Sequence, residues 1–103
     1  MKLIKYLEDA IEEEIEGVKG YAMKAAELKD SHPGLAQTLY NISVQEDAHQ
    51  AALHKEVVKI IEEHRREHGE PPAAMMAVYE YVHRKHIDEL ADARRYQDVY
   101  KSS

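Results

Sequence analysis

The sequence predicts an all-α protein, and three observations lead to this prediction. Ala, Glu, Lys and Leu, which favour helices, dominate the 103 residues, while Phe and Trp are absent. All three prolines and two of the four glycines are confined to two short breaks. Between the breaks, apolar residues recur on a seven-residue repeat, as they do in packed helices. We therefore expect a single domain, residues 1–103, with three helices at roughly 2–29, 34–68 and 72–100.

The two breaks carry residues that are typical of helix ends. In the break at residues 30–34, Ser31 is a candidate N-cap and Pro33 suits the first turn of a helix. In the break at residues 69–72, Gly69 suits the position after a helix, and the two prolines that follow prevent its continuation. Because the first break is short, the first two helices should form an antiparallel hairpin, to which a third, C-terminal helix is added.

Composition and charge argue against several functional classes. The chain has no Cys, which excludes disulfides, zinc–thiolate sites and iron–sulfur clusters. The formal net charge is −6 with acidic residues spread along the chain, so nucleic acid is not expected as a partner. The sequence has neither a signal-peptide pattern nor a run of apolar residues long enough to cross a membrane. We expect a cytoplasmic protein without a membrane partner.

Polar residues interrupt the apolar stripes of the first two helices. In the first helix, Glu14 and Tyr21 occupy stripe positions; in the second, Glu46, His49 and Glu56 do. A buried carboxylate must be protonated, paired or bound to a metal ion. The apolar members of the two stripes are Ile4, Leu7, Ile11, Val18, Ala25 and Leu28 in the first helix, and Leu35, Leu39, Ile42, Leu53 and Ile60 in the second.

Glu14, Glu46 and His49 form a candidate metal site. Glu46 and His49 are three residues apart and point the same way, so they can reach one cation, or two with Glu46 bridging. Glu14 lies about 17 residues before the hairpin turn, and Glu46 and His49 lie about 14 to 18 after it, so at about 1.5 Å per residue all three share one height. The alternative is a hydrogen-bonded Glu–His–Glu network without a metal. Two carboxylates and one imidazole suit iron or manganese.

At these residues the chain resembles the ferritin-like superfamily, which includes ferritins, rubrerythrins and encapsulated ferritins. Its pattern is a Glu on the first helix, a Tyr seven residues later and a Glu-x-x-His on the second helix; here these are Glu14, Tyr21 and Glu46-Asp47-Ala48-His49. The family holds two metals with two such sets, and this chain has one. The resemblance therefore implies a homodimer, or a higher homo-oligomer, that completes a four-helix bundle with two iron ions per dimer, manganese being the other candidate.

The resemblance further implies ferroxidase-like oxidation of Fe(II) by oxygen or peroxide, so that the protein would be an oxidoreductase. Glu46 would bridge the two metals, and Glu14 and His49 would each bind one. Tyr21 would hydrogen-bond a ligand or donate one electron; the other interpretation is a tyrosine at the stripe edge with its hydroxyl in water. Encapsulated ferritins usually carry a C-terminal shell-targeting peptide; residues 100–103 do not show this pattern, so packaging in a shell is not expected.

A function of another class is also compatible with the sequence. The C-terminal half, with residues 71–79, resembles small phage-encoded proteins of unassigned role. The alternative function is a non-enzymatic helical assembly or virion-associated protein with a structural or vestigial metal site. A metal buffer without turnover is a third alternative.

Several other polar residues have two interpretations. Glu80, His83 and His86 are spaced three residues apart and form either a solvated face or a second metal site. Glu56 is either a cation entry site or an exposed residue. The acidic residues Glu12, Glu13 and Glu16 are expected in solvent, and so are the histidines His32, His54, His64 and His68, some of them as caps. Gly17 and Gly20, inside the first helix, indicate a close helix approach or a local bend.

Overall fold

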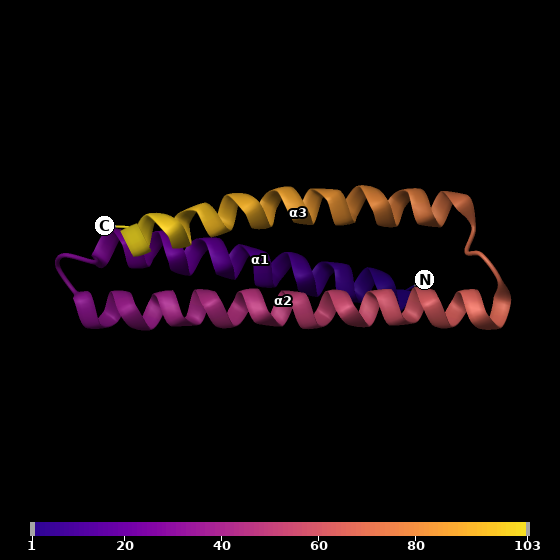
Figure 1. Ribbon diagram of the computed structural model, residues 1–103, viewed down its shortest axis with the longest axis horizontal. Helices are drawn as coiled ribbons and strands as arrows, with labels where there is room; N and C mark the ends of the chain where they lie inside the picture. Colours follow the sequence, from indigo (N-terminus) through magenta and orange to yellow (C-terminus); the bar gives the residue numbers. More distant parts are fainter. Residues whose placement is uncertain (1, 103) are drawn as a thin grey trace.

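A computed structural model describes residues 2–102 as three long helices. They are α1 (Lys2–Leu28), α2 (Pro33–His68) and α3 (Ala73–Ser102), and no strand occurs in this part of the chain. The helices lie side by side in a rod with extents of 56 × 19 × 18 Å (Figure 1). The all-α prediction is confirmed, and each helix begins and ends within two residues of its expected position.

The two breaks hold most of the predicted helix-end features. Gly69 has φ +81°, a value that favours glycine, and its backbone N–H donates to the Arg65 carbonyl oxygen. Pro33 is at the start of α2, as expected. The prediction of Ser31 as the N-cap was wrong. His32 occupies that position, its side chain makes no capping hydrogen bond, and its Nδ1 lies 2.9 Å from the Ser31 hydroxyl.

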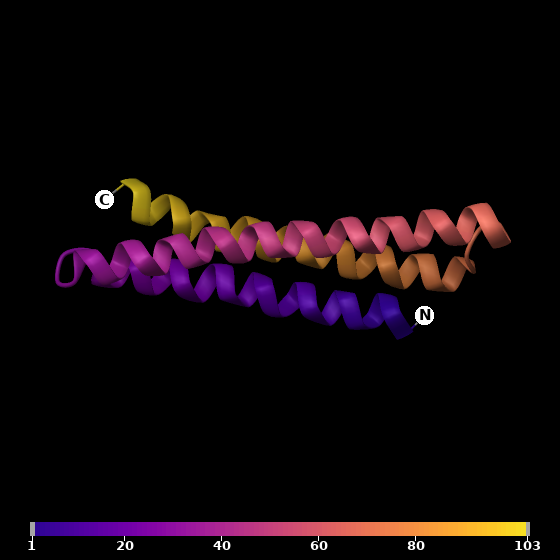
Figure 2. The ribbon, with the colours of Figure 1, turned by 90° about the horizontal axis from the view of Figure 1, so that it is seen from below.

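α1 is the helix on which the other two pack. It contacts both α2 and α3 along its length, whereas α2 and α3 touch each other at only a few points (Figures 1 and 2). One apolar cluster lies toward the N-terminal end of α1 and a second surrounds Tyr100 at the other end. The buried members of the first cluster are Ile4, Leu7, Ile11, Ile15, Val57 and Ile61.

The buried stripes differ in detail from the predicted ones. In α1 the stripe runs through Ile15 and Ala22, which places Glu14 and Tyr21 at its edge rather than in its centre. In α2 the most buried residues are Ala36, Ser43, Gln50, Val57 and Ile61. The predicted α2 stripe lies beside this line and is half-buried or exposed. The difference arises because the buried stripes face α3 as well as each other. Their centres are therefore shifted around the helix, compared with a contact between two helices alone.

Polar side chains also join the three helices. Ser43, fully buried on α2, donates from its hydroxyl to the Val18 carbonyl oxygen of α1 at 2.6 Å. The same hydroxyl accepts a hydrogen bond from the amide of Gln97 on α3 at 3.0 Å. Nearby, Arg94 of α3 makes two hydrogen bonds of 2.8 Å to the Asp47 carboxylate of α2. Ser43 therefore links all three helices at one level.

None of the helices described is long and apolar enough to cross a membrane.

Replacing Ser43→Ala should destabilise the protein by about 1–3 kcal/mol, because the buried Gln97 amide and Val18 carbonyl lose a partner. Urea unfolding at one fixed protein concentration measures this change. Thr38→Ala is the matched control, since the exposed Thr38 hydroxyl bonds only within its own helix. Equal effects of the two substitutions would contradict the linking role of Ser43.

Candidate metal centre

The structure brings Glu14, Glu46 and His49 together, as the sequence predicted. Each offers one ligand atom, and these atoms lie within 4.8 Å of one another. His49 Nδ1 is 3.4 Å from Glu14 Oε2. Helix α1 supplies Glu14 and helix α2 supplies the other two, at the same height of the antiparallel hairpin.

The group lies on the flank of the hairpin that faces away from α3. Glu12 and Lys19 of α1 make ion pairs with residues of α3. Glu14 is two residues from Glu12, which is about 200° around the helix, so it points to the opposite side. The site is open on this flank: the side chain of Glu14 is 26% exposed and that of His49 is 59% exposed.

The two carboxyl groups are close enough to disturb each other. The pKa of Glu46 is raised, first by hydrogen-bonding contact with the Glu14 carboxyl, then by partial burial and the Glu14 charge; the nearby His49 acts in the opposite direction. Glu14 Oε2 is buried and accepts no hydrogen bond from the described residues. Two acidic groups that share one small space, with an oxygen atom left unsatisfied, suit a cation between them.

Gly17 makes room for the Glu46 carboxylate. A Cβ atom at position 17 would lie 3.1 Å from Glu46 Oε2, whereas one at position 20 would meet nothing within 4 Å. Close approach therefore explains Gly17, although the approaching group is a side chain rather than the helix backbone. No such contact accounts for Gly20.

Tyr21 and Glu56, the other polar residues of the predicted stripes, lie outside this group. Tyr21 is 39% exposed beside a surface depression lined by Gly17, Gly20 and Leu39. Within residues 2–102 it makes no hydrogen bond to Glu14, so its role stays a prediction. Glu56 is exposed and pairs with Lys59 at 3.4 Å, in agreement with the interpretation that its carboxylate is in water.

A second group of possible ligands was missed by the sequence analysis. Glu12, His86 and Glu89 also offer three ligand atoms within 4.8 Å of one another. The expectations that Glu12 is in solvent and that His86 belongs to a solvated face were wrong: Glu12 is half-buried and His86 is buried. The spacing of His86 and Glu89 was available from the sequence, but their partner on α1 was not, because the packing angle of α3 was unknown.

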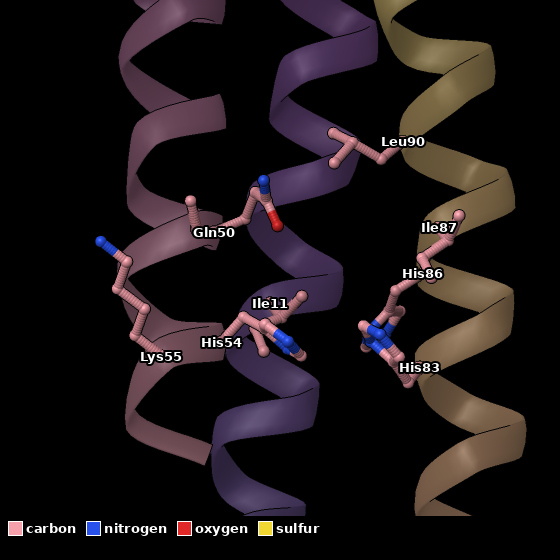
Figure 3. Close-up of a pocket in the computed structure, with 9 residues that line it drawn as sticks. Ile11, Gln50, His54, Lys55, His83, His86, Ile87 and Leu90 are labelled. Carbon is pink, nitrogen blue, oxygen red and sulfur yellow. The ribbon is translucent and has the colours of Figure 1, made fainter. Parts of the chain in front are cut away.

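His83 and Glu80 do not join His86 in a metal site. The His83 ring stacks on the His54 ring of α2 with centroids 4.5 Å apart, and Glu80 is exposed. Figure 3 shows these imidazoles pointing into the groove between α2 and α3, beside Ile11 of α1. His54 is thus half-buried rather than a surface residue, and its pKa is lowered by burial and then by the neighbouring His83 and His86.

Comparisons with protein families, curated proteins and solved structures found no significant match to the chain. The resemblance to the ferritin-like superfamily therefore depends on Glu14, Tyr21, Glu46 and His49 alone.

The contribution of His54 to the free energy of unfolding should increase as the pH rises toward the ordinary pKa of 6.5. The pKa of His54 is lower in the fold than its ordinary value of 6.5, so as the pH falls the unfolded chain takes up a proton first. The stabilisation by neutral His54 is complete above the ordinary pKa. It is lost as the pH falls toward the lower pKa that His54 has in the folded protein. Urea unfolding in the presence of a chelator measures the profile. The slope of the free energy of unfolding against pH should decrease in His54→Gln but not in His68→Gln. Equal slopes in the two variants would contradict the role of His54.

Gly17→Ala should weaken the binding of a divalent cation by Glu14, Glu46 and His49, because the new methyl group displaces the Glu46 carboxylate. Gly20→Ala is the matched control, since both substitutions raise helix propensity by about 1 kcal/mol. Titration with Co²⁺, followed by its visible absorption, compares the two. If both variants bind the ion equally well, the role assigned to Gly17 is wrong.

Proposed function

We propose that this chain forms one half of a carboxylate-bridged di-iron centre and oxidises Fe(II) in a ferroxidase-like reaction. The observation that carries the proposal is the convergence of Glu14, Glu46 and His49, with a buried, unsatisfied carboxylate oxygen among them. Two carboxylates and one imidazole are the donor set of one half of a ferritin-like site. The proposed fold of the assembly is correspondingly a four-helix ferritin-like bundle.

Three donors from one chain leave such a centre incomplete. A di-iron site of this class has six protein ligands, two single Glu residues and two Glu-x-x-His pairs. A second copy related by a two-fold axis would bring the same three residues to the opposite side of the metals. Glu46 of each copy would bridge the two ions, while Glu14 and His49 would each bind one.

The surroundings of the site support a second copy as the partner. The flank of α1 and α2 that contains the site also presents apolar side chains, and exposed apolar surface marks interaction sites. Tyr21 and Leu35 are 39% and 50% exposed there. Leu39, Ile42, Leu53 and Ile60, which the sequence analysis placed in the α2 stripe, are only half-buried within one chain. Packing two of these flanks together would bury the apolar residues and exclude water from the metals.

The proposed reaction removes one electron from each of two ferrous ions. The two electrons, with two protons, reduce one dioxygen molecule to hydrogen peroxide; peroxide itself is the alternative oxidant. The residues of this chain would hold the two ions at a fixed separation and balance most of their charge with four carboxylates. Tyr21, one helical heptad from Glu14, would hydrogen-bond a ligand or supply an electron.

One observation favours the alternative of a non-enzymatic assembly. The pKa of Glu46 is raised by hydrogen-bonding contact with the Glu14 carboxyl, which supports an arrangement in which the two carboxyl groups share a proton instead of a metal ion. In that case the same flank would hold copies together, as in a structural or virion-associated protein, with a structural or vestigial metal site.

Anaerobic addition of Fe(II) to the metal-free protein, followed by air, tests the proposal. We expect a mass by light scattering of at least twice the 11.9 kDa of one chain. We also expect rapid formation of ferric iron, seen as near-ultraviolet absorbance. Glu46→Gln should lose two iron ions per dimer and the rapid oxidation. Glu56→Gln, an exposed Glu on the same helix, is the matched control and should keep both.

Three results would count against the proposal. A strict monomer cannot assemble the symmetric centre. Equal iron content and oxidation rate in Glu46→Gln and Glu56→Gln would remove the site from the reaction. An iron-loaded protein that does not react with oxygen or peroxide would favour the structural role or a metal buffer.

A further inference from the structure

We propose that Glu12, His86 and Glu89 form a second, separate binding site for a divalent transition-metal ion, between α1 and α3. This site does not depend on the proposed di-iron centre and needs no second copy of the chain. Glu12 comes from α1, and His86 and Glu89 come from successive turns of α3. One atom of each lies within 4.8 Å of the others.

The imidazole is the best-enclosed member of the group. The side chain of His86 is only 10% exposed, and its Nε2 is 3.0 Å from Glu12 Oε2. The carboxylates on either side of it are 27% and 33% exposed, for Glu12 and Glu89. The imidazole is thus enclosed, while the two carboxylates remain partly open to solvent.

Among residues 2–102, the buried Glu89 Oε1 atom accepts no hydrogen bond. The buried Glu12 Oε2 atom lies 3.0 Å from His86 Nε2, so one imidazole serves a group of two carboxylates. An unsatisfied buried acceptor is unfavourable, and more so when it carries charge. Burial, followed by contact with Glu12, also raises the pKa of Glu89. A cation bound by both carboxylates and the imidazole would satisfy these atoms together.

Lys85 is the cation already present, and its contacts are loose. Its ammonium nitrogen lies 3.9 Å from Glu12 Oε1 and 3.9 Å from Glu89 Oε1, beyond hydrogen-bond length. Its side chain is 54% exposed, so it can swing into solvent. A metal ion would compete with Lys85 for the two carboxylates. Removing Lys85 should therefore strengthen metal binding, which is not expected if the group is only a structural ion-pair network.

The donor set indicates the kind of metal. Ca²⁺ and Mg²⁺ take oxygen ligands almost exclusively, whereas an imidazole nitrogen with two carboxylates suits Mn²⁺, Fe²⁺, Co²⁺ or Zn²⁺. Three protein ligands leave at least one coordination position open to water or a small ligand. Because Glu12 and Glu14 point to opposite sides of α1, the two sites are distinct.

Titration with Co²⁺ tests the proposal in a background that lacks the first site, Glu46→Ala/His49→Ala. We expect this double variant to bind one Co²⁺ per chain, with visible absorption from a nitrogen- and oxygen-coordinated ion. Adding Glu89→Gln should weaken binding by at least roughly tenfold, since even indirect support of a ligand contributes that much. Adding Glu80→Gln, an exposed Glu of the same helix, should change nothing.

Removing the competing cation provides the second arm. Lys85→Ala in the same background should bind Co²⁺ more tightly, and circular dichroism verifies that each variant is folded. Absence of Co²⁺ binding in the double variant would overturn the proposal, as would equal affinities of the Glu89→Gln and Glu80→Gln variants. Weaker binding in Lys85→Ala would do the same. None of these outcomes bears on iron oxidation at Glu14, Glu46 and His49.

Discussion

The packing of α1 against two helices whose backbones come close to each other at only a few points determines the rest of the structure. Its buried stripe, which includes Ile11, Ile15, Val18 and Ala22, must face both α2 and α3. The polar residues on either side of that stripe are consequently brought against a neighbouring helix without being fully enclosed. Glu14 meets α2 on one side and Glu12 meets α3 on the other, so each becomes part of a group of potential metal ligands.

Small residues set how closely these groups approach. Fully buried Val18 and Ser43 are in contact where α1 and α2 meet, and the short Ser43 side chain reaches the α1 backbone directly. At the residue directly before Val18, the missing side chain of Gly17 leaves space for the Glu46 carboxylate. Ligands carried by long, well-packed helices are held more rigidly than ligands on loops, which favours metal binding without large rearrangement.

The sequence was sufficient for the helices and for the first ligand group, but not for the second. Helix ends follow from Pro33 and Gly69, and the meeting of Glu14 with Glu46 and His49 follows from the short hairpin, because both are local constraints. The direction from which α3 packs is a tertiary property. It shifts the buried stripes by part of a helical turn from their expected positions. It also brings His86 of α3 to Glu12 of α1, a contact that the residue spacing within one helix cannot indicate.

The central claim is that two copies of this chain share a pair of iron ions. The most direct measurement is anomalous X-ray scattering at the iron edge from crystals grown or soaked anaerobically with Fe(II). The account predicts two iron ions across a two-fold axis, each beside Glu14 and His49 of one copy, with Glu46 of both copies between them. Copies that meet through a different face, or iron absent from these residues, would contradict it.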